Sequence, residues 1–481
     1  MTVQAFRIQN FMCFEDSGWV ELRPLTLFYG RNSAGKSAFL RSLLLLRQTL
    51  QFVREPGLSS QPDKSALIFA PDDGSSGLDF GSYRALVRDH DIGRAMSFWF
   101  ECAIIDGDGP EVVTALSGLG IKATVQIRLS YGLFKEQVRL QEVALYDDAL
   151  DEKEGLIIKA TAPQPDASAD QAWRFEADFF VGGSVWPPTA LVVEEGFFPQ
   201  LRVLKEDEAK GEGAHLKEFG HIQQLLCHCK RSILEFFKTM EYIGPRRPEP
   251  QRFYHLAKES NAHSANGQHL VCALLSQQEQ SKKTLSSINQ WLAEFGLPKR
   301  LQVKSLAEAP TSYQLLFTDP LSGTSPPFQA NITEVGFGMS QLLPVVIETL
   351  LALENSSLVI EQPELHLAPT VQSQLADLLI YVAVHKNVRL LVETHSENLL
   401  IRVRRRVAES SAEYVLPDEE CYLPHEALRV HFVNKEERKS EVRRIDIGPM
   451  GGMLYKPPAY RGFFSSDLRD TVKLTKAQLG R

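Results

Sequence analysis

Long apolar runs are absent from this sequence. No stretch of eighteen or more uncharged apolar residues occurs, and the opening MTVQAFRIQNFMCFEDSGWV lacks a basic start followed by an apolar segment. A transmembrane helix needs about 20 predominantly apolar residues, and a secretory leader needs the missing N-terminal pattern. We therefore expect a cytoplasmic protein with no membrane partner.

Cysteine and net positive charge are also scarce. Six irregularly spaced cysteines in 481 residues are too few for a disulfide framework, so we expect reduced thiols. The formal net charge of -8 excludes the broad basic field of a protein that coats nucleic acid. Any contact with nucleic acid would have to be local. The 43% hydrophobic content is ordinary for a chain with a large core.

A phosphate-binding motif follows a predicted strand near the N-terminus. GRNSAGKS fits the Walker A pattern and lies between the strand-like LTLFYG and the helix-like AFLRSLLLLRQTLQFV. Its glycines let backbone N–H groups turn toward phosphates, and the helix start adds its positive dipole end. Lys36 supplies a mobile charge and the Ser37 hydroxyl a ligand for Mg²⁺. The predicted ATP-binding residues here are Gly30, Asn32, Ser33, Ala34, Gly35, Lys36, Ser37 and Ala38.

Two later apolar strands end in polar side chains. The run LVI in SSLVIEQPELHLAP ends at Glu361, and VRLLVETHSENLL closes with Thr394, His395 and Ser396. A carboxylate at the tip of a buried parallel strand beside a phosphate loop holds Mg²⁺ or its water. Glu361 and Ser37 are therefore the predicted metal ligands. His395 is predicted to sense the γ-phosphate, with an ordinary surface histidine as the alternative.

A second candidate anion cradle lies in TEVGFGMSQLLPVVIETLLAL, a glycine-containing turn followed by an apolar helix. Free amides at this helix start would bind phosphate, and the predicted residues are Gly336, Gly338, Ser340 and Gln341. One nucleotide does not need two cradles on the same side. We therefore expect this cradle to cap the ATP of another subunit, in a head-to-tail homodimer or a larger homo-oligomer.

The ordered set GRNSAGKS, VGFGMSQ, LVIEQPELHLAP and LVETHS resembles the ATPase heads of the ABC-like group that includes RecF, Rad50, SMC and OLD-type AAA ATPases. The form E-x-P-E-x-H-L-x-P is especially similar to the ATPase subunits of bacterial antiphage systems such as PARIS, Septu and retrons. The resemblance implies an α/β fold, an ABC-type P-loop ATPase head, with VGFGMSQ as the signature and His395 as the switch histidine. It also implies ATP and Mg²⁺ as ligands.

Gln362 departs from the pattern of that group, in which a glutamate that polarises the attacking water usually follows the Walker B acid. Glutamine can orient water but cannot accept a proton. Slow hydrolysis is expected, unless Glu364 acts as the base. The predicted catalytic residues are Glu361, Gln362, Glu364 and His395.

The hydrophobic pattern, the motifs and the family resemblance together divide the chain into five expected segments. We expect an ATPase segment with Walker A over 1–95, a β-rich insertion over 96–210 and a helical or mixed insertion over 211–330. A second ATPase segment with the signature, Walker B and switch histidine follows over 331–405. The tail over 406–481 resembles the C-terminal domain of unknown function that often closes such ATPases. Helices are predicted at about 216–240 and over KKTLSSINQWLAEFG.

Three further clusters carry weaker signals. Arg246 or Arg247 in IGPRRP would reach a phosphate or form a structural salt bridge. Cys227, His228, Cys229 and His221 are poorly placed for zinc because adjacent ligands on a helix diverge, and core thiols are the preferred interpretation. The run RVRRRV, 402–407, is interpreted as a solvated helix face in preference to a contact with nucleic acid.

Coiled-coil arms, a C-x-x-C hook and a fused nuclease are all missing from the sequence. We therefore expect an ATPase that dimerises around ATP and acts as a sensor or scaffold for a separate effector, a nuclease or toxin, in antiphage defence. DNA or a phage protein is the expected trigger. The alternative is a RecF-like DNA repair or recombination ATPase, and a transporter engine ranks last because of the chain length and the insertion.

Overall fold

The protein is described from a computed structural model that divides the chain into two compact units. The first unit is Met1–Leu22, Ser33–Met240 and Lys435–Val442, and the second is Arg23–Asn32, Glu241–Asn434 and Arg443–Arg481. The residues described are 2–52, 66–70, 78–104, 112–115, 124–134, 136–147, 155–161, 174–181, 184–185, 189–194, 200–203, 215–247, 249–255, 274, 278–297, 300–306, 309–319, 329–411, 421–458 and 460.

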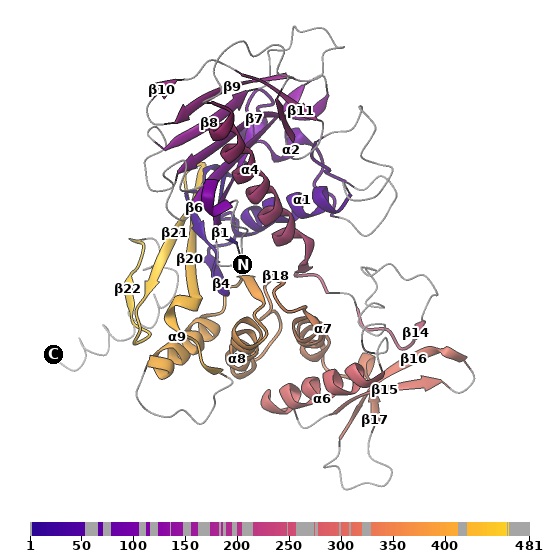
Figure 1. Cartoon of the computed structure of the whole chain (residues 1–481). Coiled ribbons are helices and arrows are strands. Elements are labelled where there is room, and N and C mark those ends of the chain that lie inside the picture. Colours follow the sequence, from indigo (N-terminus) through magenta and orange to yellow (C-terminus); the bar gives the residue numbers. More distant parts are fainter. Residues whose placement is uncertain are drawn as a thin grey trace, which may run out of the picture. The chain divides into compact units, whose positions relative to one another are not determined.

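An antiparallel sheet of eleven strands organises the first unit (Figure 1). Its main order is β12-β11-β9-β8-β7-β6-β5-β1-β2, with β3 on β1 and β10 on β9. The strands are β1 (Val3–Phe11), β2 (Phe14–Asp16), β3 (Val20–Glu21), β5 (Met96–Ala103), β6 (Thr124–Phe134), β7 (Gln137–Asp147), β8 (Leu156–Thr161), β9 (Arg174–Val181), β10 (Ser184–Val185), β11 (Thr189–Glu194) and β12 (Gln200–Val203).

The strands from β5 to β12 all lie within residues 96–210, the range that the sequence predicted to be rich in strands. Along β6, buried and half-buried residues alternate over its first half, which is the pattern of a sheet with one covered face. The sheet also continues into the N-terminal strands, because β5 pairs with β1 over Val3 to Gln9. The division of the chain into five segments stays a prediction.

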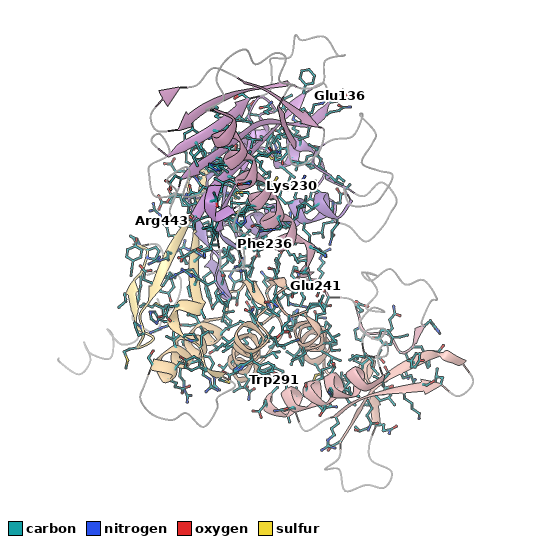
Figure 2. All side chains as sticks on the ribbon, in the orientation of Figure 1. Glu136, Lys230, Phe236, Glu241, Trp291 and Arg443 are labelled. Carbon is teal, nitrogen blue, oxygen red and sulfur yellow. The ribbon has the colours of Figure 1, made fainter. Side chains whose placement is uncertain are left out.

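The long helices of this unit are α1 (Lys36–Phe52) and α4 (His215–Lys238), which contact each other. Both were predicted and both are confirmed. Short helices α2 (Tyr83–Leu86) and η1 (Arg88–His90) follow α1 in the described chain. Near the end of α4, Phe236 packs against Phe237 at 4.9 Å, and Phe237 meets Phe100 of β5 at 6.0 Å between ring centroids (Figure 2). On the same helix Cys229 is buried as expected, whereas Cys227 is exposed.

A second sheet, of seven strands, has the order β13-β18-β19-β4-β20-β21-β22. Its strands are β13 (Met240–Ile243), β18 (Ser357–Glu361), β19 (Arg389–Glu393), β4 (Leu25–Gly30), β20 (Leu428–Glu436), β21 (Lys439–Ile447) and β22 (Met453–Tyr455). The four strands β18, β19, β4 and β20 are parallel. Every residue of β4, β18 and β19 is buried, which explains their continuous apolar sequences. The predicted α/β class is confirmed.

Helices α7 (Phe337–Leu351), α8 (Pro369–His385) and α9 (Glu397–Ser411) belong to the second unit, and α8 packs against both α7 and α9 (Figure 1). A smaller sheet contains β14 (Tyr254–His255), β15 (Arg300–Leu306), β16 (Ala309–Thr318) and β17 (Gln329–Asn331), and it adjoins α6 (Gln278–Glu294) and η2 (Ile332–Glu334). Trp291 of α6, a helix predicted from sequence, packs on Tyr381 of α8 at 5.6 Å (Figure 2). A short helix η4 (His425–Ala427) precedes β20.

A buried ion-pair cluster joins α8 to α9. The carboxylate of Asp377 accepts hydrogen bonds from Arg402 at 2.6 Å and from Arg406 at 2.8 Å. Asp377 and Arg406 are both at most 9% exposed at their side chains. The interpretation of this arginine run as a solvated face is therefore wrong for Arg406 and holds only for Arg405, which is 61% exposed. None of the helices in the described part of the chain is long and apolar enough to span a membrane.

Replacing Asp377 with Asn removes the carboxylate that binds Nε and Nη2 of the buried Arg406 guanidinium and leaves its pair with Glu409 at 3.0 Å. We expect the free energy of unfolding to fall by about 3 kcal/mol, because removing one partner of a buried ion pair exposes the full desolvation cost of the other. Urea denaturation followed by circular dichroism measures this change. Arg405→Ala is the matched control, since its exposed pair with Glu409 is worth less than about 1 kcal/mol. Equal, small effects of the two substitutions would contradict the role assigned to Asp377.

Candidate functional site

Gly30 ends β4 and opens the phosphate loop within the second unit. Its φ of +153° lies in a region that residues with side chains rarely adopt. A Cβ at this position would lie 2.2 Å from the carbonyl oxygen of Val433 on the neighbouring strand β20. Glycine is therefore required here by the packing of two parallel strands. Asn32, which follows, is exposed.

The rest of the phosphate loop belongs to the first unit. Ser33 has a φ of +59° and Gly35 a φ of +113°. A Cβ on Gly35 would lie 2.8 Å from the Cys13 sulfur and 3.1 Å from the Ser440 hydroxyl, so the loop passes close to both side chains. Sequence reasoning did not find these two neighbours, since neither belongs to a motif.

Helix α1 begins at Lys36, so its first-turn amides and its positive dipole end follow the glycine loop directly. Lys36 is buried, as are Ala34 and Ala38, and Ser37 is half-buried. The predicted strand–loop–helix context of the motif is confirmed. A loop whose glycines cannot carry side chains and which feeds a helix start has the form required to hold the phosphates of a nucleotide.

Glu361 forms the tip of β18 in the second unit, as predicted. Its side chain is buried, and Oε1 accepts a hydrogen bond from the Tyr242 hydroxyl at 3.0 Å. Glu393 lies directly beside it at the tip of β19. Mg²⁺ in nucleotide sites takes one or two carboxylates together with phosphate oxygens. The oxygen donors present at this tip fit that ion.

The turn after Glu361 is held from two sides. Gln362 has a φ of +48°, and its N–H donates to the Glu393 carbonyl at 2.7 Å. On the other side, Nη2 of Arg247 donates to the carbonyl oxygens of Glu361 at 3.1 Å and of Gln362 at 3.0 Å. The element IGPRRP therefore reaches the Walker B turn. These hydrogen bonds join Arg247 to backbone carbonyl oxygens. They are neither the phosphate contact nor the salt bridge that the sequence suggested for Arg246 or Arg247.

Glu364 is a buried carboxyl group close to the switch segment. Its Oε1 accepts a hydrogen bond from the His395 N–H at 2.6 Å. Its Oε2 has no hydrogen-bond partner among the residues that the structure describes. Burial raises the pKa of Glu364 above its ordinary value. Hydrogen bonds from the backbone N–H groups of His395 and Glu364 and from the Thr394 side chain partly offset that rise, as does the charge of Arg247.

His395 is half-buried and its backbone is fixed by its neighbours. The Tyr29 hydroxyl donates to the Ser396 carbonyl at 3.1 Å. The Ser396 hydroxyl donates to Oε1 of Gln372 at 2.7 Å and accepts from Leu399 N–H at 3.0 Å, which caps the start of α9. The segment that carries the switch histidine is thus anchored to β4, α8 and α9.

The glycine turn of the predicted signature begins α7. Gly336 is the exposed N-cap, with no side-chain hydrogen bond at that cap. A Cβ on Gly338 would lie 2.7 Å from the carbonyl oxygen of His366, so this glycine is needed for close packing against the loop that follows Glu364. Ser340 and Gln341 are buried in this chain. Only the first residue of the predicted cradle is exposed.

Within the second unit, the fold brings Glu361, Gln362, Glu364 and His395 to one edge of the parallel sheet. Tyr242 and Arg247 join them, although sequence reasoning gave Tyr242 no role and left that of Arg247 open. The element IGPRRP was a signal for Arg247, and Tyr242 directly precedes that element. Among the described residues, no group of three or more His, Cys, Asp or Glu side chains is arranged to hold a metal ion by itself.

Comparisons with known proteins agree with an ATPase. Residues 247–400 match the family model described as AAA ATPase domain, a range that includes Arg247, Glu361, Glu364 and His395. No curated protein sequence matches the chain. The chain thus carries an ATPase domain.

Solved structures give a weaker likeness. One is the Smc head bound to the C-winged helix domain of ScpA, at 10% identity, covering 93% of this chain and 98% of that one, with a TM-score of 0.39. Another is the SMC head domain from Thermotoga maritima, at 10% identity, 93% and 100% coverage and a TM-score of 0.36. A third is the Smc head from Pyrococcus furiosus bound to the C-terminal domain of ScpA, at 9% identity, 92% and 96% coverage and 0.36. At such scores the ATPase assignment rests on the family model and the geometry.

Gly338→Ala places a methyl group against the His366 carbonyl. We expect the free energy of unfolding to fall by about 1–3 kcal/mol, because backbone must move to admit the added carbon. The matched variant is Gly336→Ala, whose added Cβ would meet nothing within 4 Å. Thermal and urea denaturation of both variants measure the difference. A stable Gly338→Ala protein beside a destabilised Gly336→Ala protein would reverse this assignment.

Proposed function

We propose that this protein hydrolyses ATP with Glu364 as the general base, and that Gln362 orients the attacking water. One observation carries the proposal: Glu364 is buried, its Oε1 is occupied by the His395 amide, and Oε2 has no partner among the described residues. A base is most effective when its pKa lies near the working pH. Burial moves the pKa of Glu364 upward, in that direction.

The remaining residues take roles that match their chemistry. Lys36, Ser37 and the loop glycines bind the phosphates and Mg²⁺, and Glu361 provides the carboxylate for the ion. Mg²⁺ bound to ATP would neutralise charge on the phosphates. Gln362 cannot take a proton, so its side-chain amide is limited to hydrogen bonding. His395, whose backbone N–H donates to Glu364, would report the presence of the terminal phosphate.

Glu364→Gln removes the base and keeps the size of the side chain. We expect kcat to fall by at least about 100-fold, the ordinary contribution of a positioned base, with ATP binding retained. In the unaltered protein, turnover falls as pH drops through the raised pKa of Glu364, since the protonated carboxyl cannot accept a proton. Phosphate release against pH, and equilibrium binding of a fluorescent ATP analogue, separate the two effects.

Gln362→Ala is the companion variant, and it is expected to lower kcat less than Glu364→Gln does. The reverse order would assign the dominant role to Gln362. A turnover rate that Glu364→Gln leaves unchanged would remove Glu364 from the reaction.

We further propose that bound ATP closes a head-to-tail homodimer, or a larger homo-oligomer, in which the start of α7 caps the nucleotide of a second subunit. The support is the exposed N-cap of α7 at Gly336, where backbone amides at a helix start favour a phosphate. The rate of ATP hydrolysis would then set the lifetime of the closed state. The closed state would control a separate effector, a nuclease or toxin, in antiphage defence, with DNA or a phage protein as trigger.

No observation favours the RecF-like alternative in particular. The α9 arginines that would have offered a local basic surface bind within the chain: Arg402 and Arg406 to Asp377, and Arg404 to the Gly451 carbonyl. Salt-dependent binding of purified protein to duplex DNA would revive that alternative.

ATP-dependent self-association tests the dimer. The Glu364→Gln protein, which should retain ATP, is expected to double in mass with Mg²⁺ and ATP and to remain a monomer with ADP. Light scattering after size-exclusion chromatography measures the mass. Lys36→Ala, which removes the phosphate-binding charge, is expected to stay monomeric in both cases. Equal masses with ATP and ADP in every variant would contradict a nucleotide-closed dimer.

A further inference from the structure

Arg247 and Arg246 are neighbours with opposite environments. Both follow β13 in the second unit, but Arg247 is 7% exposed, whereas Arg246 is exposed to solvent. Burying a guanidinium costs several kcal/mol of hydration free energy unless the surroundings compensate its charge. The buried charge of Arg247 therefore requires compensating contacts.

One nitrogen of Arg247 holds the Walker B turn. Nη2 lies 3.1 Å from the Glu361 carbonyl oxygen and 3.0 Å from that of Gln362. Gln362 has a φ of +48°, a conformation that costs free energy for a residue with a side chain and persists only where its surroundings enforce it. Arg247 binds two carbonyl oxygens of this turn, and the Gln362 N–H donates to Glu393. These hydrogen bonds hold Gln362 in that conformation.

The other nitrogens of Arg247 have a different environment. Nε and Nη1 have no hydrogen-bond partner in the part of the chain that the structure describes. Burial lowers the pKa of the Arg247 guanidinium, and the negative charges of Glu364 and Glu348 oppose that shift. A neutral donor would bind two carbonyls at a lower desolvation cost. Arg247 binds the carbonyl of Gln362, and Glu364 follows Gln362 by two residues, so the charge is attached to the turn that carries this buried carboxylate, whose Oε2 also has no hydrogen-bond partner in the described residues.

We propose that Arg247 is a positioning residue for hydrolysis: it fixes the turn that aims Glu361 and Gln362, and its buried charge balances the carboxylate of Glu364. This inference rests on the proposed function, because it assigns Glu364 the role of base. Arg247 acts through these neighbours, so its loss should lower turnover more than it weakens the binding of ATP.

The experiment compares three variants of the full chain. Arg247→Gln keeps a hydrogen-bond donor and removes the charge, Arg247→Lys keeps the charge and loses the planar fork, and exposed Arg246→Gln is the matched control. We expect Arg247→Gln to lower kcat at least about tenfold, equivalent to about 1.4 kcal/mol. Its dissociation constant for a fluorescent ATP analogue with Mg²⁺ is expected to change less than about threefold. Arg247→Lys is expected to recover part of the rate, and Arg246→Gln to match the unaltered protein.

Several results would overturn the inference. An Arg247→Gln protein with unchanged kcat removes the positioning role, and so does a variant whose ATP affinity falls while kcat stays constant, which would make Arg247 a phosphate ligand. If Arg247→Gln does not fold, Arg247→Lys is judged by the same criteria. An unaltered protein without turnover contradicts the proposed function itself. If the unaltered protein turns over ATP, Glu364→Gln abolishes that turnover and Arg247→Gln leaves it intact, then only the inference about Arg247 is contradicted.

Discussion

Backbone hydrogen bonding of β4 between β19 and β20 is the constraint on which the second unit depends. All three strands are parallel, and β18 continues the row on the far side of β19. Parallel strands end at a common edge, so Gly30, at the end of β4, and the tips at Glu361 and Glu393 lie at one edge of this sheet. Every residue of β4, β18 and β19 is buried, so apolar packing on both faces holds this edge in register. The pairing of these strands therefore determines where Gly30, Glu361 and Glu393 lie.

The edge of that sheet carries an unusual load of buried charge. Glu361, Glu364, Glu393 and Arg247 are each less than a tenth exposed. Folding would be more favourable with neutral side chains there, because each ion loses its hydration. The hydrogen bonds from Tyr242 to Glu361 and from the His395 amide to Glu364 recover part of that cost. If these groups act on ATP as proposed, positions fixed by the fold would favour electrostatic catalysis.

The sequence predicted the elements better than the contacts. Continuous apolar runs predicted β18 and β19, three- and four-residue spacing of apolar residues predicted α4, and the motif itself required the strand and helix around Gly30. Tyr242 and Arg247 escaped because their partner, Glu361, is 119 and 114 residues away, and no local pattern encodes such a pairing. The arginine run of α9 failed differently. Its counter-ion, Asp377, lies inside an otherwise apolar stretch of α8. The sequence of α9 alone therefore cannot distinguish a solvated arginine face from a buried ion pair.

Gly338 has a consequence for how such chains are compared. Its neighbour, the His366 carbonyl, would exclude any larger residue even if no nucleotide ever approached α7. Selection would therefore keep glycine at this position in relatives that have lost their ATPase, while Gly336, with open space around its Cα, would be free to vary in them. Retention of the second glycine of this turn is a record of packing between α7 and the loop after Glu364. Retention of the first is the better marker of a helix start still used for ligand binding.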